Sequence, residues 1–173
     1  MNKAKLGNKE AHPTMSPIFV STQTSALLTG KSVRTIHNWL ESGVIMGRAV
    51  PAAHIPGGQM WQIDLSSIAA NVQTEMTDEF LECVRQADAG DAKEMNNVGT
   101  YFYKSKEYKI AVGWFEVAAK KGCADAMDLL SMCYINGIGV GKSHALGIQW
   151  LGKAAALGHS VAKVKLLALG FEV

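Results

Sequence analysis

The sequence has few cysteines and lacks any long apolar run. Cys83, Cys123 and Cys133 are odd in number and form no Cys-x-x-Cys pair, so we expect reduced, buried thiols rather than a disulfide framework. The first 15 residues contain no apolar segment of the length that a signal peptide needs. Nowhere do about 18 apolar residues follow one another, as a membrane span requires. These absences predict a cytoplasmic protein with no membrane segment.

The sequence also lacks the residue patterns that carry catalysis or bind metals. None of the five histidines stands at metal-ligand spacing with a cysteine, and no Ser-His-Asp set or carboxylate pair can be assigned. We therefore predict no metal site, no cofactor and no enzymatic activity. GIGVGKS at residues 137–143 is similar to a phosphate-binding loop, but that loop requires a glycine where this sequence has Asn136. We interpret it as a turn between two helices.

Positive charge is sparse and unevenly divided. The formal net charge is +2. Residues 1–73 carry six Lys or Arg and three acids, whereas residues 74–173 carry eleven and twelve. The N-terminal part is therefore the expected partner of a polyanion. A hydrophobic content of 48% with 18% charged residues is typical of a folded protein, although we expect residues 1–17 to form a disordered tail.

After this tail, local signals predict two short helices around a tight turn. Ser21 or Thr22 can cap the first helix. Gly30 allows a sharp turn, Ser32 can cap the second helix, and Gly43 ends it. The apolar face of the second helix consists of Val33, Ile36, Trp39 and Leu40, at helical spacing.

A hairpin and a third helix follow. The strand-like segments Val44–Val50 and Met60–Ile63 flank a loop rich in proline and glycine. Asp64 can then cap a helix over about residues 65–72. Two helices, a hairpin and a helix in this order predict a small winged helix-turn-helix domain over residues 18–73.

Beyond Gly90 the sequence repeats itself. EMNNVGTYF at residues 94–102 aligns with AMDLLSMCY at residues 126–134. Trp114, the pair Ala118-Ala119 and Gly122 recur 36 residues later as Trp150, Ala154-Ala155 and Gly158. A third copy starts at Ala162 and stops after one helix. Periods of this length are typical of stacked helix pairs. We therefore predict a mainly α protein, with an α-solenoid of about two and a half helix pairs over residues 77–173.

The string LLTGKSVRTIHNWLESGVI resembles the helix-turn-helix of MerR-type regulators and phage excisionase-like proteins. The matching positions are Gly30, Ser32, Arg34, Thr35, Ile36 and Trp39. GGQMWQI followed by Asp64-Leu65 looks like the return strand of that family's wing and its next helix. The resemblance covers about residues 19–72 and implies a DNA-binding protein of a bacterium or mobile element. The wing here is longer and has a single arginine, and His37 and Asn38 stand where the family has two basic residues.

This resemblance implies DNA contacts from the second helix and the wing. Ile36, Trp39 and Leu40 face inward, so polar side chains remain on the outer face. Arginine can pair with guanine and asparagine with adenine in the major groove, and a helix start suits a phosphate. The residues expected to contact DNA are Lys31, Ser32, Arg34, Thr35, His37, Asn38 and Arg48. The alternative is a solvated helix surface in a domain that binds protein.

YINGIGV and WLGKAAALGHSVA resemble the Sel-one-like repeats, relatives of the tetratricopeptide repeats. The resemblance covers about residues 77–170 and implies an α-solenoid that binds other proteins and has no catalytic residues. The helix of the third copy, about residues 160–169, is apolar on more than one side. We therefore expect a homodimer, and the alternative is a monomer whose last residues fold back over this helix. The expected interface residues are Leu166, Leu169, Phe171 and Val173.

Three functions remain open. The first is a transcriptional regulator that binds a specific double-stranded DNA sequence and whose repeats dimerise or dock a partner. The second is an excisionase-like factor that bends DNA for recombination or replication of mobile elements. The third is an adaptor that binds protein through both parts and does not bind DNA.

Overall fold

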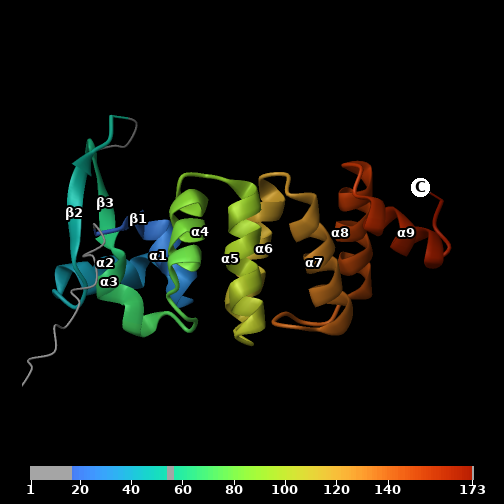
Figure 1. The fold of residues 1–173 in the computed structure, drawn as a ribbon, viewed down its shortest axis with the longest axis horizontal. Coiled ribbons are helices and arrows are strands. Elements are labelled where there is room, and N and C mark those ends of the chain that lie inside the picture. The colour runs from blue at the N-terminus through green and yellow to red at the C-terminus, as the bar shows by residue number, and fades with distance from the viewer. Residues whose placement is uncertain (1–16, 54–56, 173) are drawn as a thin grey trace, which may run out of the picture.

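The computed structural model describes residues 17–53 and 57–172. In this part of the chain the protein is mainly α-helical, as predicted, and elongated. A small N-terminal unit with the β-sheet lies at one end, and helices α4 to α9 follow one another toward the other end (Figure 1). The predicted tail, apart from Pro17, and the expected interface residue Val173 lie outside the described residues.

The N-terminal unit contains one more strand than the sequence predicted. Its elements are β1 (Phe19–Ser21), α1 (Thr22–Thr29), α2 (Val33–Glu41), β2 (Gly47–Pro51), β3 (Gln59–Asp64), α3 (Leu65–Ile68) and a 3-10 turn (Ala69–Asn71). The sheet is antiparallel, in the order β1-β3-β2. The hairpin is present, but its first strand starts at Gly47 rather than at Val44. The third helix is shorter than predicted: α3 ends at Ile68, and the chain continues only as the 3-10 turn.

The predicted capping residues start the helices of this unit. The Ser21 hydroxyl accepts a hydrogen bond from the Thr24 amide at 3.1 Å, and the Ser32 hydroxyl accepts one from the Thr35 amide at 3.1 Å. Gly30 ends α1 in the left-handed conformation, with φ of 65°. These local signals therefore placed α1 and α2 correctly.

The second part of the chain is a row of helices, in which α4 to α8 alternate in direction and α9 lies obliquely across the end (Figure 1). They are α4 (Asp78–Asp88), α5 (Ala92–Lys104), α6 (Tyr108–Lys120), α7 (Ala124–Asn136), α8 (His144–Ala156) and α9 (Ser160–Ala168). Glycine lets the two helices of each pair approach closely. A Cβ atom at Gly99 would lie 2.7 Å from the Phe115 ring, and one at Gly147 would lie 2.5 Å from the Ile135 side chain. The longer second repeat is explained by the α7–α8 connection, residues 137–143.

The two repeat tryptophans do not have the same environment, although their positions in the repeat match. Trp114 is only 1% exposed. Trp150 is partly buried, and the Lys153 ammonium lies 4.1 Å from the centre of its ring. Trp114 therefore belongs fully to the buried core of the repeats, whereas Trp150 packs against that core only in part.

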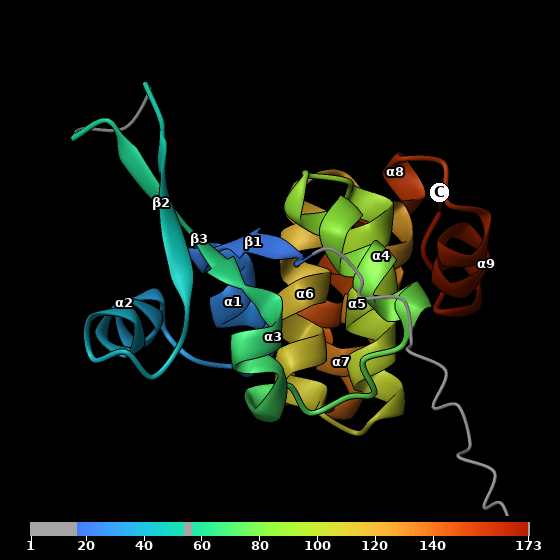
Figure 2. The ribbon, with the colours of Figure 1, turned by 60° about the vertical axis from the view of Figure 1, so that its left-hand side comes forward.

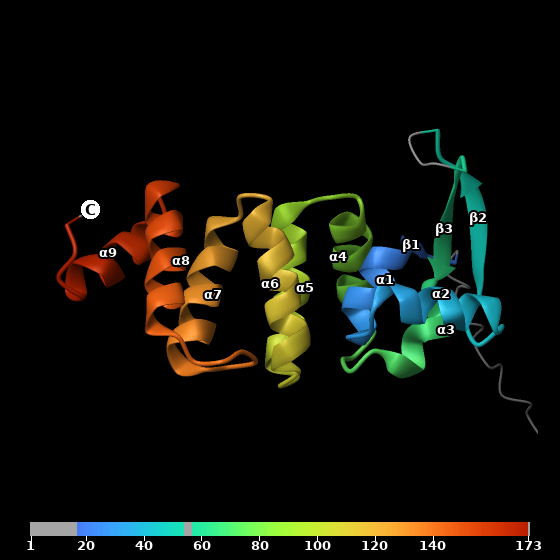
Figure 3. The ribbon, with the colours of Figure 1, turned by 180° about the vertical axis from the view of Figure 1, so that it is seen from behind.

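The N-terminal unit packs directly on the helical row. The Ser21 amide donates to both carboxylate oxygens of Asp88 in α4, at 3.0 and 3.2 Å. A Cβ atom at Gly30 would lie 3.2 Å from the Ile110 side chain in α6. β1 contacts α4 and α1 contacts α6, and the view from behind shows this N-terminal unit against the end of the helical row (Figure 3). Buried side chains from both parts belong to one apolar cluster.

At the end of the helical row, the predicted exposure of one interface residue is wrong. Leu166 was expected at an exposed interface, but it is only 4% exposed because it belongs to the apolar cluster of the row. Leu169 and Phe171 are 53% and 44% exposed, as expected. Val161, Val164 and Leu167 are the exposed apolar side chains of α9 that the prediction did not include.

Candidate functional site

Helix α2 presents a polar face at the outer end of the N-terminal unit. Figure 2 shows α2 and the β2–β3 hairpin projecting away from the helical row. Lys31, Ser32, Arg34, His37 and Asn38 are exposed, and Thr35 is half-buried. Within the described residues, the side chains of Lys31, Arg34, His37 and Asn38 have no hydrogen-bond or ion-pair partner. The face is therefore free to contact another molecule.

The opposite side of α2 attaches the helix to the unit. Ile36 is fully buried, and Trp39 and Leu40 are half-buried. Val33 was expected on this apolar face but is 38% exposed, because it lies beside the cleft between α1 and α6. One fully buried side chain thus anchors a helix of nine residues.

Three of the expected DNA-contact residues make side-chain contacts within the protein. The Ser32 and Thr35 hydroxyls lie 2.9 Å apart, and Ser32 also caps the helix. The Arg48 guanidinium lies 4.0 Å from the centre of the Phe19 ring, and its Nε–H donates to Gln62 Oε1 at 3.0 Å. These contacts hold Arg48 against the sheet.

Strand register separates Arg48 from α2. Arg48 is paired with Gln62, whereas Gly47 is paired with Ile63, and neighbouring residues of a strand point to opposite faces. A Cβ atom at Gly47 would lie 2.9 Å from Leu40 of α2, so α2 packs on the Gly47–Ile63 face. The structure therefore brings the α2 residues together and places Arg48 on the other face of the sheet.

The electrostatic field of the described N-terminal unit is weak. Residues 17–73 contain three bases, Lys31, Arg34 and Arg48, and two acids, Glu41 and Asp64. The other bases of the predicted basic half lie in residues 1–16, outside the described part. The positive excess of the folded unit is therefore smaller than the sequence count suggested.

Three exposed apolar side chains of the N-terminal unit were not identified from the sequence. Val44, Met46 and Trp61 are 63%, 62% and 43% exposed. The alternation of Val44 and Met46 with the buried Ile45 was the available signal. Trp61 also lines a cavity of about 180 Å³ with His37, Leu40 and Glu41.

Two of the cysteines, Cys83 and Cys133, have a raised pKa and are therefore protonated, unreactive thiols at neutral pH. Burial, and secondarily the nearby Glu94 carboxylate, raises the pKa of Cys83 to about 11. Burial raises the pKa of Cys133 to about 11 as well. Both groups therefore stay protonated, and the thiolate is the nucleophilic form. Among the described residues, no group of three or more His, Cys, Asp or Glu side chains could hold a metal ion.

The GIGVGKS segment is a turn, as predicted. It joins α7 to α8, whereas a phosphate-binding loop follows a strand. Gly137 ends α7 with φ of 74°, and Gly139, with φ of 73°, packs against the backbone of Tyr108. The Ser143 hydroxyl caps α8 by accepting from the Leu146 amide at 3.3 Å. Each of these residues therefore has a structural role in the turn.

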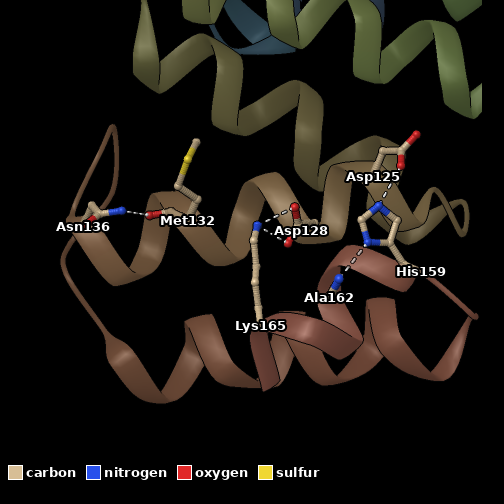
Figure 4. A network of polar contacts seen from close by, with 7 residues as sticks. All are labelled: Asp125, Asp128, Met132, Asn136, His159, Ala162 and Lys165. Carbon is tan, nitrogen blue, oxygen red and sulfur yellow. Dashed lines mark hydrogen bonds and ion pairs between the residues drawn. The ribbon is translucent and has the colours of Figure 1, made fainter. Parts of the chain in front are cut away.

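Two polar contacts hold α9 on α7 (Figure 4). Lys165 Nζ lies 2.7 Å from both carboxylate oxygens of Asp128. His159 Nδ1 accepts from the Ala162 amide at 3.2 Å, and Nε2 lies 2.9 Å from Asp125 Oδ1. Because an Nδ1 that accepts carries no proton, the proton of the neutral ring is on Nε2, which donates to Asp125.

The orientation of α9 leaves an apolar face in solvent. Val161, Val164 and Leu167 are 51%, 65% and 58% exposed. The chain does not fold back over them as far as Glu172, because the Phe171 amide donates to the Leu166 carbonyl at 3.0 Å and Phe171 itself is exposed.

Among the helices in residues 17–53 and 57–172, α9 included, none is both long and apolar enough to cross a membrane.

Comparison with known proteins identifies the repeats. Residues 94–123 and 124–159 match the Sel1 repeat family, and these two segments correspond to the pairs α5–α6 and α7–α8. No curated protein and no solved structure matches the chain. The Sel-one-like resemblance is thus confirmed for residues 94–159, and the match does not include residues 19–72. Residues 94–159 therefore match two Sel1 repeats, a type of helical module that is typical of protein interaction and typically not catalytic.

Proposed function

We propose that the protein is a cytoplasmic adaptor between DNA and a protein partner. The Sel1 repeats bind the partner, and the N-terminal unit binds double-stranded DNA as a winged helix-turn-helix. The observation that supports the DNA-binding part is the face of α2, where Lys31, Arg34, His37 and Asn38 are exposed and have no partner among the described residues. A helix with this arrangement can enter the major groove with its outer side.

The proposed DNA contact depends on α2 more than on the hairpin. Arg34 and Asn38 carry side chains that can each make two hydrogen bonds to a base edge. Lys31 lies where the chain enters the helix and suits a phosphate. Arg48 is held by Phe19 and Gln62 on the other face of the sheet, so in this proposal it contributes little.

The test is a measurement of duplex binding at fixed salt, first with random and then with selected sequence. Arg34→Ala and Asn38→Ala should each weaken specific binding by about 1–3 kcal/mol and leave thermal stability unchanged. Lys120→Ala removes an exposed base from α6, far from α2 along the chain, and serves as the control. The proposal is wrong if the wild type does not bind DNA at low salt, or if both α2 variants bind as the wild type does.

An adaptor without DNA binding is the second candidate, and the exposure of the apolar side chains Val44, Met46 and Trp61 favours it. In that case the N-terminal unit binds a protein through these apolar side chains. Trp61→Ser and Met46→Ser should then abolish capture of that partner, whereas Arg34→Ala should have no effect. The opposite pattern, with loss of duplex binding by Arg34→Ala alone, supports the first candidate.

Two roles on DNA fit the first candidate. A transcriptional regulator changes the output of nearby promoters when its gene is deleted. An excisionase-like architectural factor bends its site, which is visible in circular-permutation gel shifts. Genome-wide mapping of the bound sites, combined with these two measurements, separates the roles.

We further propose a homodimer through α9. The exposed Val161, Val164 and Leu167 form the centre of the proposed interface, and Leu169 and Phe171 extend it; Leu166 is buried and is not part of it. Light scattering should give a dimer for the wild type and a monomer for the double variant Val164→Asp/Leu167→Asp. A wild-type monomer at micromolar concentration contradicts this proposal.

A further inference from the structure

A cleft of about 640 Å³ lies where the N-terminal unit meets the repeats. Its walls come from α1, the turn into α2, the 3-10 turn and α6. Pockets that bind small molecules have volumes of about 300–1,000 Å³ and occur preferentially between domains. The cleft is therefore large enough for a small organic ligand that would touch both parts of the chain.

The floor of the cleft is apolar. Leu27 from α1 and Ile110 and Val117 from α6 are partly buried there. Gly113 lies between Ile110 and Val117 along α6, and a Cβ atom at this glycine would be 3.5 Å from Leu27. The missing side chain at Gly113 keeps the floor open.

The rim of the cleft is polar and carries more positive than negative charge. Lys31 and Lys109 are exposed at the rim, and Glu107 is the one acid that lines the cleft. Neither lysine has an ion-pair partner within residues 17–53 and 57–172. Amide side chains complete the rim, from Gln23, Asn71 and Gln73.

We propose that this cleft binds a small anionic amphiphile, whose apolar body lies on the floor and whose acid group faces Lys31 and Lys109. The two exposed ammonium groups attract an acid group and repel a cation, so the rim favours a ligand that carries negative charge. Binding there goes beyond the proposed function and does not depend on it. The ligand would also contact Val33, the first residue of α2. A bound ligand would therefore touch the helix that carries the exposed polar face.

The test uses two fluorescent probes that differ in one acid group. They are 8-anilinonaphthalene-1-sulfonate and the neutral N-phenyl-1-naphthylamine. All titrations use the background variant Val164→Asp/Leu167→Asp, so that the apolar face of α9 does not bind the probes. We expect saturable binding of one sulfonate molecule per protein.

Charge reversal tests the rim. Lys31→Glu/Lys109→Glu should weaken sulfonate binding at least about tenfold and leave binding of the neutral probe nearly unchanged, because the acid group alone contacts the lysines. Lys120→Glu changes the same charge on α6 outside the cleft and should have no effect. Equal sulfonate affinity in all three proteins, or absence of saturable binding, overturns the proposal.

Gly113→Leu tests the floor. It places a side chain in the cleft and should abolish binding of both probes, whereas circular dichroism should show an intact helical fold. Probe binding that survives this change in a folded protein also overturns the proposal. Duplex binding, measured separately, reports only on the proposed function, so failure of one proposal can be distinguished from failure of the other.

Discussion

The N-terminal unit and the Sel1 repeats use their helices differently. In the repeats, Ala118, Ala119, Ala154 and Ala155 are all buried between closely packed helices. In the N-terminal unit, α2 has a single fully buried side chain, Ile36, and a series of exposed polar ones. The buried alanines of the repeats allow the helices to stack closely, whereas the exposed polar side chains of α2 take no part in packing. The proposed DNA contact uses these exposed polar side chains of α2.

The largest expected effect is the loss of stability when a repeat tryptophan is replaced, and it compares the two repeats with each other. Trp114→Ala should lower the free energy of unfolding by about 3–5 kcal/mol, because a fully buried aromatic side chain is removed. Trp150→Ala should cost about 1–2 kcal/mol, since part of this ring is already in solvent. Urea unfolding followed by circular dichroism measures both.

Trp61→Ala is the control for these two variants, because Trp61 is exposed on the hairpin and should change stability little. Equal losses for Trp114 and Trp150 would mean that the two repeats are equivalent in solution. That result would contradict the difference in burial between them.

The next prediction concerns the contact between the two regions. Asp88→Ala removes the acceptor of the Ser21 amide and should lower the free energy of unfolding by about 1–2 kcal/mol, because a partly buried donor loses its partner. Hydrogen exchange at Ser21 should become faster at the same time. Asp88→Asn keeps an acceptor oxygen and should lose less. If Asp88→Ala leaves both measurements unchanged, the N-terminal unit does not depend on this contact with α4.

A smaller effect is expected at Glu82 on the exposed side of α4. Hydrogen bonds from Arg85 and then from Gln86 lower the pKa of Glu82 from 4.5 to about 2. Because the pKa is lower in the folded protein, this contribution to stability is present above about pH 4.5 and is lost as the pH falls toward about 2. An NMR titration of the Glu82 carboxyl carbon measures it. Arg85→Met should move the midpoint back toward 4.5, and an unshifted wild-type midpoint would contradict the hydrogen bonds.

The smallest expected effect is at Lys142, in the turn of the second repeat. Lys142→Ala should leave the free energy of unfolding unchanged. Calorimetry should detect no ATP binding to the wild type or to this variant. Ser143→Ala, one residue away, should instead destabilise α8 by about 1 kcal/mol through loss of its cap. ATP binding that disappears with Lys142 would show that the segment is a nucleotide site after all.

Local signals in the sequence determined where the helices of the N-terminal unit begin and how the repeats are spaced. Ser21, Ser32 and Asp64 start helices as predicted, because a cap involves only residues within one turn. The recurring Trp, Ala-Ala and Gly predicted the Sel1 repeats, because each repeat packs on its neighbours in the same way. The polar face of α2 was predictable for a similar reason, since helical periodicity separates it from Ile36.

Only the tertiary structure decided the features that depend on distant residues. The short strand β1 exists through its pairing with β3, much later in the chain. Strand register places Arg48 beside Phe19, on the other face of the sheet from α2. Leu166 and Val164 are similar in sequence terms, and the packing of α9 on the row buries one and exposes the other. The cleft between α1 and α6 likewise arises from a contact between the two regions, which no local pattern encodes.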